Sequence, residues 1–111
     1  MSEKELSEKA FEAIEVAKAT GKIKKGTNEV TKALEKGLVK LVVIAKDVNP
    51  KEITMHIPVL AKEKGVPCVE VPTKEELGAA AGLGLPTVSI AIIGEGNAKK
   101  TIQEIVKLIK G

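Results

Sequence analysis

Hydrophobic residues recur along this chain with two different periods, and their alternation predicts the order of the elements. Over residues 3–20 they fall three or four apart, which is typical of one helical face, and Gly21 ends the pattern. Residues 41–45 form an unbroken aliphatic run instead, which is typical of a strand buried on both faces. By the same criteria we predict helices at 3–20, 27–37, 50–65, 73–82 and 97–109, and strands at 22–25, 41–45, 69–71 and 88–93.

The predicted order is αβαβαβαβα, in which buried strands alternate with helices. That order indicates an α/β fold, a three-layer α/β/α sandwich with a four-stranded mixed sheet. At 111 residues the chain is long enough to bury a real core, and we find no internal repeat, linker or low-complexity tract. We therefore expect one domain over residues 1–111.

Polar residues that can accept a hydrogen bond stand at the start of several predicted helices. Glu76 completes a capping box with the threonine three residues before it. Pro58 lies inside the helix that is predicted to begin at Pro50, and it should bend or break that helix. The residues expected to cap helices are Thr27, Asn49, Thr73 and Asn97.

The charged residues are almost all lysine and glutamate, a bias associated with heat-stable proteins. All 18 basic residues are lysine, and the net charge of +3 gives mild support for an anionic partner. The chain has one Phe and neither Tyr nor Trp, which leaves almost no aromatic surface for stacking on bases. No stretch resembles a signal peptide or a membrane span, and we expect a cytoplasmic protein.

The reactive side chains do not form a catalytic or metal-binding pattern. His56 is the only histidine, and no Cys or carboxylate lies at metal-ligand spacing around it. Cys68 stands alone in an apolar run, which excludes an internal disulfide and favours a small core residue. The glycines of residues 21–27 resemble a phosphate-binding loop, but Thr27 stands where that motif needs a lysine. We expect no enzyme, no cofactor and no metal.

A polar cluster marks the start of the helix at 27–37. Gly26 and Thr27 precede Asn28, Glu29 and Lys32, which share the first turn of that helix. Free N–H groups at a helix start, beside an amide, a carboxylate and an ammonium, suit bases and phosphates. The alternative is a well-capped surface helix with no ligand.

The loop before the last predicted strand is unusually apolar. Leu83, Leu85, Pro86 and Val88 crowd a glycine-flanked connection that would normally be polar. Apolar loop tips tend to mark contact surfaces. The alternative is that these residues close one end of the core.

Two blocks of this sequence occur together at a spacing that identifies a family. The first is Gly-x-Asn-Glu-x-x-Lys at residues 26–32, and the second is His-x-Pro at residues 56–58. With residues 41–53, 66–69 and 77–82, they resemble the kink-turn RNA-binding ribosomal proteins. These are the archaeal "L-seven-A-e" family, with relatives in eukaryotic small nucleolar ribonucleoproteins. The resemblance covers almost the whole chain.

The resemblance implies an α/β/α sandwich that binds and stabilises kink-turns, which are sharply bent RNAs with tandem sheared G·A pairs. Asn28 and Glu29 would contact the guanines, with Lys32 beside them, and Lys36 and Lys74 would contact the backbone. Ile53 and the apolar loop would pack on nucleotides of the bulge. The full set implied to bind RNA is Gly26, Thr27, Asn28, Glu29, Lys32, Lys36, Ile53, Lys74, Leu83, Leu85, Pro86 and Val88.

The implied partners are ribosomal RNA of the large subunit, box C/D and H/ACA guide RNAs, possible ribonuclease P RNA, and core proteins of small ribonucleoproteins. Two other hypotheses remain open. One is a ribosomal relative restricted to a single ribosomal RNA site. The other is a protein-interaction module on the same fold. Three departures from the family pattern stand out: Leu85 replaces a basic residue of some eukaryotic relatives, Asn49 replaces a usual acidic one, and Leu85-Pro86-Thr87 is not the small-residue loop typical of the archaeal proteins. In this family the chemistry of that loop separates general kink-turn binders from narrower ones.

Overall fold

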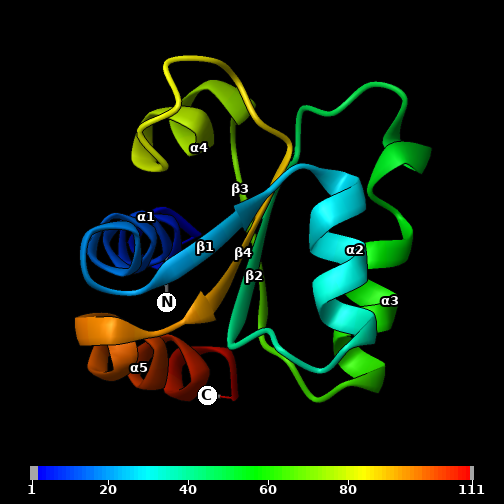
Figure 1. The fold of residues 1–111 in the computed structure, drawn as a ribbon. Coiled ribbons are helices and arrows are strands. Elements are labelled where there is room, and N and C mark those ends of the chain that lie inside the picture. The colour runs from blue at the N-terminus through cyan, green and yellow to red at the C-terminus, as the bar shows by residue number, and fades with distance from the viewer. Residues whose placement is uncertain (1–2, 111) are drawn as a thin grey trace.

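The computed structural model describes residues 3–110 and has the predicted alternation of helices and strands (Figure 1). Residues 1, 2 and 111, which the predicted single domain includes, lie outside the described residues. The helices are α1 (Glu3–Thr20), α2 (Thr27–Glu35), α3 (His56–Glu63), α4 (Lys74–Ala80) and α5 (Lys99–Lys110). The strands are β1 (Lys22–Lys25), β2 (Leu41–Ala45), β3 (Cys68–Val71) and β4 (Ser89–Gly94), and two short 3-10 turns are η1 (Lys51–Ile53) and η2 (Gly96–Ala98).

The four strands form one mixed sheet in the order β1-β4-β2-β3. β2 pairs with β3 in parallel, and β4 pairs antiparallel with both β1 and β2. It follows that β1, β2 and β3 run in one direction and β4 runs in the other. Their three carboxyl ends therefore lie at the same edge as the amino end of β4, which is the upper edge in Figure 1.

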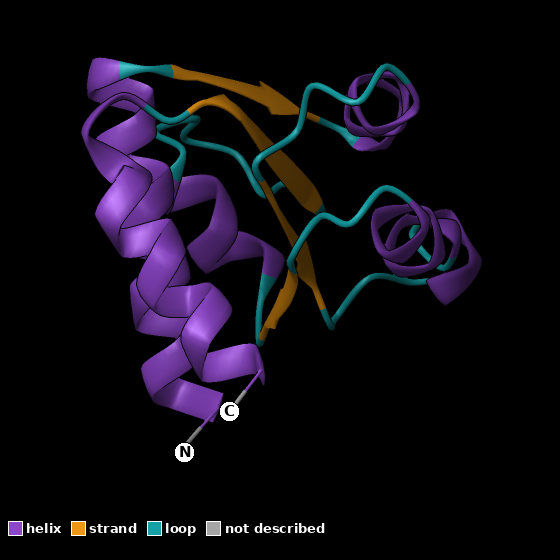
Figure 2. Ribbon diagram, turned by 90° about the horizontal axis from the view of Figure 1, so that it is seen from below, coloured by secondary structure: helices purple, strands orange, loops and turns teal. Residues whose placement is uncertain are grey.

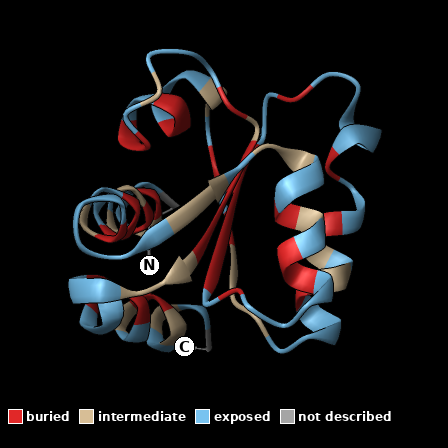
Figure 3. Cartoon of the chain, viewed as in Figure 1, coloured by how far each residue is buried: buried red, intermediate tan, exposed pale blue. Residues whose placement is uncertain are grey.

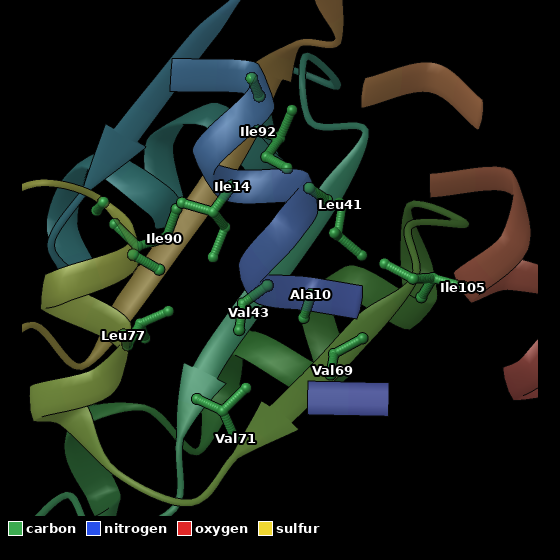
Figure 4. Close-up of a cluster of buried hydrophobic side chains, with 14 of the residues drawn as sticks. Ala10, Ile14, Leu41, Val43, Val69, Val71, Leu77, Ile90, Ile92 and Ile105 are labelled. Atoms are coloured by element: carbon green, nitrogen blue, oxygen red, sulfur yellow. The ribbon is translucent and has the colours of Figure 1, made fainter. Parts of the chain in front are cut away.

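Helices cover both faces of the sheet, which confirms the predicted α/β/α sandwich (Figures 1 and 2). α1, α4 and α5 pack on one face, around Ile14, Leu77 and Ile105 (Figure 4). α2 and α3 pack on the other face, around Leu34 and Ile57. All five residues of β2 are buried because each face of this central strand meets a helical layer (Figure 3).

The helix at residues 27–37 starts and ends nearly as predicted, but its cap differs. Thr27 is the first helical residue rather than the cap, and Gly26 takes the cap position with φ 88° and no side chain to donate or accept. The backbone oxygen of Gly26 already accepts from the N–H of Val30 at 2.9 Å, which moves the helix start one residue earlier. Gly37 ends the helix in a left-handed conformation, φ 71°, as predicted.

The helix predicted from Pro50 is divided into η1 and α3. A continuous helix would press the ring of Pro58 against the oxygen of Thr54, four residues earlier. The helix instead begins at His56, which places Pro58 in its first turn, and Asn49 caps nothing because no side-chain cap is present at η1. The prediction that Pro58 breaks the helix is confirmed, and the predicted start at Asn49 and Pro50 is wrong.

The last two predicted caps have opposite outcomes. The hydroxyl of Thr73 accepts from the N–H of Glu76 at 3.1 Å and donates to its carboxylate at 2.9 Å, which confirms a capping arrangement. Asn97 does not cap α5, because it lies inside η2 and the helix begins at Lys99. The backbone N–H of Asn97 donates to the Thr20 hydroxyl at 2.8 Å, which fixes this turn to the end of α1.

Candidate functional site

The predicted site residues come together largely at the upper edge of the sheet. The start of α2, the loop after β2 and the loop before β4 all meet there (Figure 1). The N–H of Gly26 donates to the oxygen of Ser89 at 3.1 Å, which joins the start of α2 directly to the start of β4. Gly26 and Ser89 are 63 residues apart along the chain, and they become neighbours because β1 lies next to β4 in the sheet.

The start of α2 presents free backbone donors toward solvent. The first N–H groups of a helix have no carbonyl partner inside it, and here the cap is a glycine with no side chain to bond them. Thr27 is half-buried, whereas Asn28 and Glu29 are exposed. This end of α2 carries a partial positive charge with an amide and a carboxylate directly on it.

Two hydrogen bonds fix this first turn against the neighbouring helix. The hydroxyl of Thr31 donates to the backbone oxygen of Thr27 at 2.7 Å and lies 2.8 Å from Nε2 of His56. A hydroxyl has one proton, and while Thr31 donates it to Thr27 its oxygen accepts from Nε2 of His56 in the tautomer that carries the ring proton there. The only histidine thus links the start of α3 to the backbone of the polar turn.

An exposed row continues from the polar turn along α2. Asn28, Lys32 and Lys36 are spaced by four and are all exposed, which places them on one line of the helix. Lys36 follows the last helical residue and lies about 12 Å along the axis from Asn28. The structure therefore places Asn28 and Glu29 at the sheet edge, Lys32 one turn further along α2, and Lys36 at the opposite end of that helix.

The apolar loop has both of the roles considered for it: part of it closes the core, and part of it forms an exposed surface. Leu83 and Val88 are half-buried; Leu83 packs on the core, and the oxygen of Val88 accepts from the N–H of Ala45 at 2.9 Å. Leu85 is 72% exposed, and Pro86 is exposed beside it. The base of the loop closes the core, and its tip offers a free apolar surface.

Backbone contacts hold this loop against α4 and the exit of β2. The N–H of Thr87 donates to the oxygen of Lys74 at 3.1 Å, and the N–H of Lys74 donates to Oδ1 of Asp47 at 2.8 Å. The loop also lies directly on Gly78, where a Cβ atom would collide with the oxygen of Leu85 and lie 3.1 Å from Cα of Pro86. The structure thus places Lys74 next to the loop. Ile53 lies in η1, 43% exposed.

A hollow of about 530 Å³ joins two of the predicted residues, Glu29 and Leu83. The other residues that line the hollow are not among the predicted site residues, although Lys24 and Lys25 directly precede Gly26. Only the fold brings in the end of α1, which is distant in sequence. The other lining residues are Lys18, Ile23, Lys24, Lys25 and Ala81.

The remaining reactive groups lie away from this edge. Burial, reinforced by the negative charge of Glu70, raises the pKa of the Cys68 thiol from 9.0 to about 12. Across residues 3–110 no three His, Cys, Asp or Glu side chains are grouped so that they could hold a metal ion. Within the same residues, no helix combines the length and the apolar character needed to cross a membrane.

The sequence matches the model of the ribosomal protein L7Ae/L30e/S12e/Gadd45 family over residues 8–102. The chain belongs to this family. The match spans every residue predicted to contact RNA, from Gly26 to Val88. The resemblance read from the two sequence blocks is therefore confirmed at the level of the family.

The L7Ae/L30e/S12e/Gadd45 fold of this chain is also similar to a solved structure, the Giardia lamblia 15.5kD RNA binding protein. The two have a TM-score of 0.89 and 33% sequence identity, and the match covers 96% of this chain and 88% of that one. The family description names ribosomal proteins, and the solved structure is that of an RNA-binding protein.

Proposed function

We propose that this chain is a one-domain kink-turn RNA-binding protein over residues 1–111. It recognises tandem sheared G·A pairs and stabilises the bent RNA without a catalytic step. The observation that carries the proposal is the start of α2, where Asn28 and Glu29 are exposed in the first turn beside unpaired helical N–H groups and Lys32 is exposed one turn further. Its RNA-binding family and its likeness to the Giardia lamblia 15.5kD RNA binding protein support the same conclusion.

The chemistry of the first turn suits base edges in an opened RNA groove. Glu29 is an acceptor and takes hydrogen bonds from guanine N–H groups, whereas Asn28 both donates and accepts. Lys32 lies one turn further, beside the same pairs, and Lys36 and Lys74 contact the backbone. Gly26 and Thr27 bring the positive end of the helix to a phosphate.

The apolar loop supplies the second part of the recognition. The exposed tip at Leu85 and Pro86 packs on unstacked nucleotides of the bulge, and Leu83 and Val88 support it from below. Ile53 covers the same nucleotides from η1. A bent RNA is recognised mainly by shape, backbone and unstacked bases, for which aliphatic side chains serve in place of aromatic ones.

The RNAs we propose as partners are large-subunit ribosomal RNA and the box C/D and H/ACA guide RNAs, and ribonuclease P RNA is a further candidate. We propose that the protein binds them in the cytoplasm. Core proteins of these particles then bind the complex. A groove of about 480 Å³ between α2 and α3 suits such proteins, because Met55 and Val59 are 62% and 61% exposed in it. The same groove supports the alternative of a protein-interaction module.

The deciding experiment compares two labelled RNAs that differ only in the tandem G·A pairs. One is a kink-turn, and the other has those pairs changed to Watson–Crick pairs. We expect tight binding and closing of the helical arms for the first RNA only. Equal weak binding to both would overturn the proposal and favour the protein-interaction alternative.

The variant Glu29→Ala tests the contact to the guanines. A good bidentate contact to a base is worth about 1–3 kcal/mol, and we expect the kink-turn affinity to fall about 5- to 150-fold. Glu35→Ala is the matched control, because it removes an exposed carboxylate at the other end of the same helix. Loss of a negative charge alone would strengthen binding in both variants, and equal effects would exclude the base contact.

A further inference from the structure

The hollow beside the first turn of α2 is basic, and its lysines have no part in the proposed readout of the G·A pairs. Lys18 reaches it from the last turn of α1, and Lys24 and Lys25 reach it from β1. Glu29 is the one carboxylate among the lining residues. Its apolar lining comes from Ile23, Ala81 and Leu83.

The charges of this hollow lie on different elements. The lysines come from α1 and β1, whereas Glu29 comes from the start of α2. The ammonium of Lys18 lies against Gly82, where a Cβ atom would collide with it. Lys18 therefore extends from α1 across to the base of the apolar loop, and three ammoniums outweigh a single carboxylate around one concave surface.

We propose that this hollow binds the phosphate backbone of the RNA arm next to the tandem G·A pairs, with Lys18 as a contact from α1. The inference rests on the proposed function. Glu29 repels phosphate and accepts from guanine, which places base edges on its side. The strand that continues from those bases then passes over the lysines, where each ammonium that neutralises a phosphate releases counterions.

Lys18 has an alternative role that involves no RNA. It lies in the last turn of α1, where a positive charge interacts favourably with the free carbonyl groups of the helix end. That role would affect the stability of the free protein. It would leave the salt dependence of RNA binding unchanged, and the two roles are therefore separable.

The test measures the affinity of the full chain for the kink-turn RNA across a series of KCl concentrations. For Lys18→Ala we expect a loss of about 3- to 10-fold and a fall of roughly one in the slope of log affinity against log salt. Lys62→Ala is the matched control, because Lys62 is an exposed lysine in the last turn of α3, on the other face of the sheet. It should change neither quantity.

The outcomes separate this inference from the proposed function. If the wild type prefers the kink-turn RNA but Lys18→Ala behaves like Lys62→Ala, the backbone site is wrong and the proposed function stands. If Lys18→Ala lowers the slope and the preference for the kink-turn persists, both are supported. A wild type without that preference overturns the proposed function, and a wild type that binds neither RNA overturns both. If Lys18→Ala lowers the melting temperature but leaves the salt slope of RNA binding unchanged, Lys18 stabilises the end of α1 and does not contact RNA.

Discussion

The contact between α4 and the apolar loop predicts that Gly78→Ala destabilises the protein, although alanine favours helices. Gly78 is a buried residue inside α4, and the loop passes directly over it. An added Cβ would collide with the backbone oxygen of Leu85 and lie 3.0 Å from its carbonyl carbon. Both atoms belong to the backbone, and the side chains cannot relieve the collision by changing rotamer.

Two opposing effects set the magnitude. Gly→Ala inside a helix is worth about 1 kcal/mol in favour of folding. Forcing an extra methyl into a packed site typically costs about 1–3 kcal/mol, and a collision with a backbone atom belongs at the upper end. We expect a net loss of about 1–2 kcal/mol, which lowers the melting temperature of a domain of this size by roughly 4–10 °C.

Thermal unfolding of Gly78→Ala and Ala79→Gly, with RNA titrations of both, tests this reasoning. Ala79 is the exposed neighbour in the same helix, and Ala79→Gly should cost about 1 kcal/mol through helix propensity alone. Gly78→Ala should also weaken kink-turn binding several-fold, because Leu85 and Pro86 move with the loop. A Gly78→Ala variant more stable than the wild type would refute the close packing of the loop on α4.

Two further predictions concern the loop tip and the partly buried Cys68 thiol. Leu85→Asp should lower kink-turn affinity at least about tenfold and leave the melting temperature nearly unchanged, because Leu85 is mostly exposed. A large fall in melting temperature would show that Leu85 contributes to the hydrophobic core instead. Cys68 should react with a thiol reagent at pH 8 at least about 100-fold more slowly in the folded than in the urea-unfolded protein. Its pKa of about 12 in place of 9.0 leaves little thiolate, and equal rates in both states would contradict this burial.

The elements of this fold could be predicted because most of their signals are local. The unbroken aliphatic run of β2 and the glycine that ends α2 are properties of neighbouring residues, and both predictions hold. The cap at Thr27 failed for a different reason. Whether a residue caps a helix or begins it depends on the backbone angles before it, and Gly26 adopts a conformation that its sequence neighbours do not specify.

The predicted site was partly visible in the sequence because its central residues lie on two successive turns of one helix. Asn28, Glu29 and Lys32 lie on one helix and stay close together however α2 packs on the sheet. The tip of the apolar loop is exposed, as expected. The basic hollow could not be found in this way. Lys18 and Glu29 face the same hollow only because β1 folds back from α1 and pairs with β4, which is a property of the whole sheet.

The place of β1 at the edge of the sheet gives its lysines a second consequence. Among residues 3–110, β1 pairs with β4 alone, and an unpaired strand edge can recruit a strand from another molecule. Three of its four residues are lysines, and charged edges of this kind repel such pairing. The charges that we propose to attract RNA to this side of the molecule therefore also oppose edge-to-edge pairing between copies of the free protein.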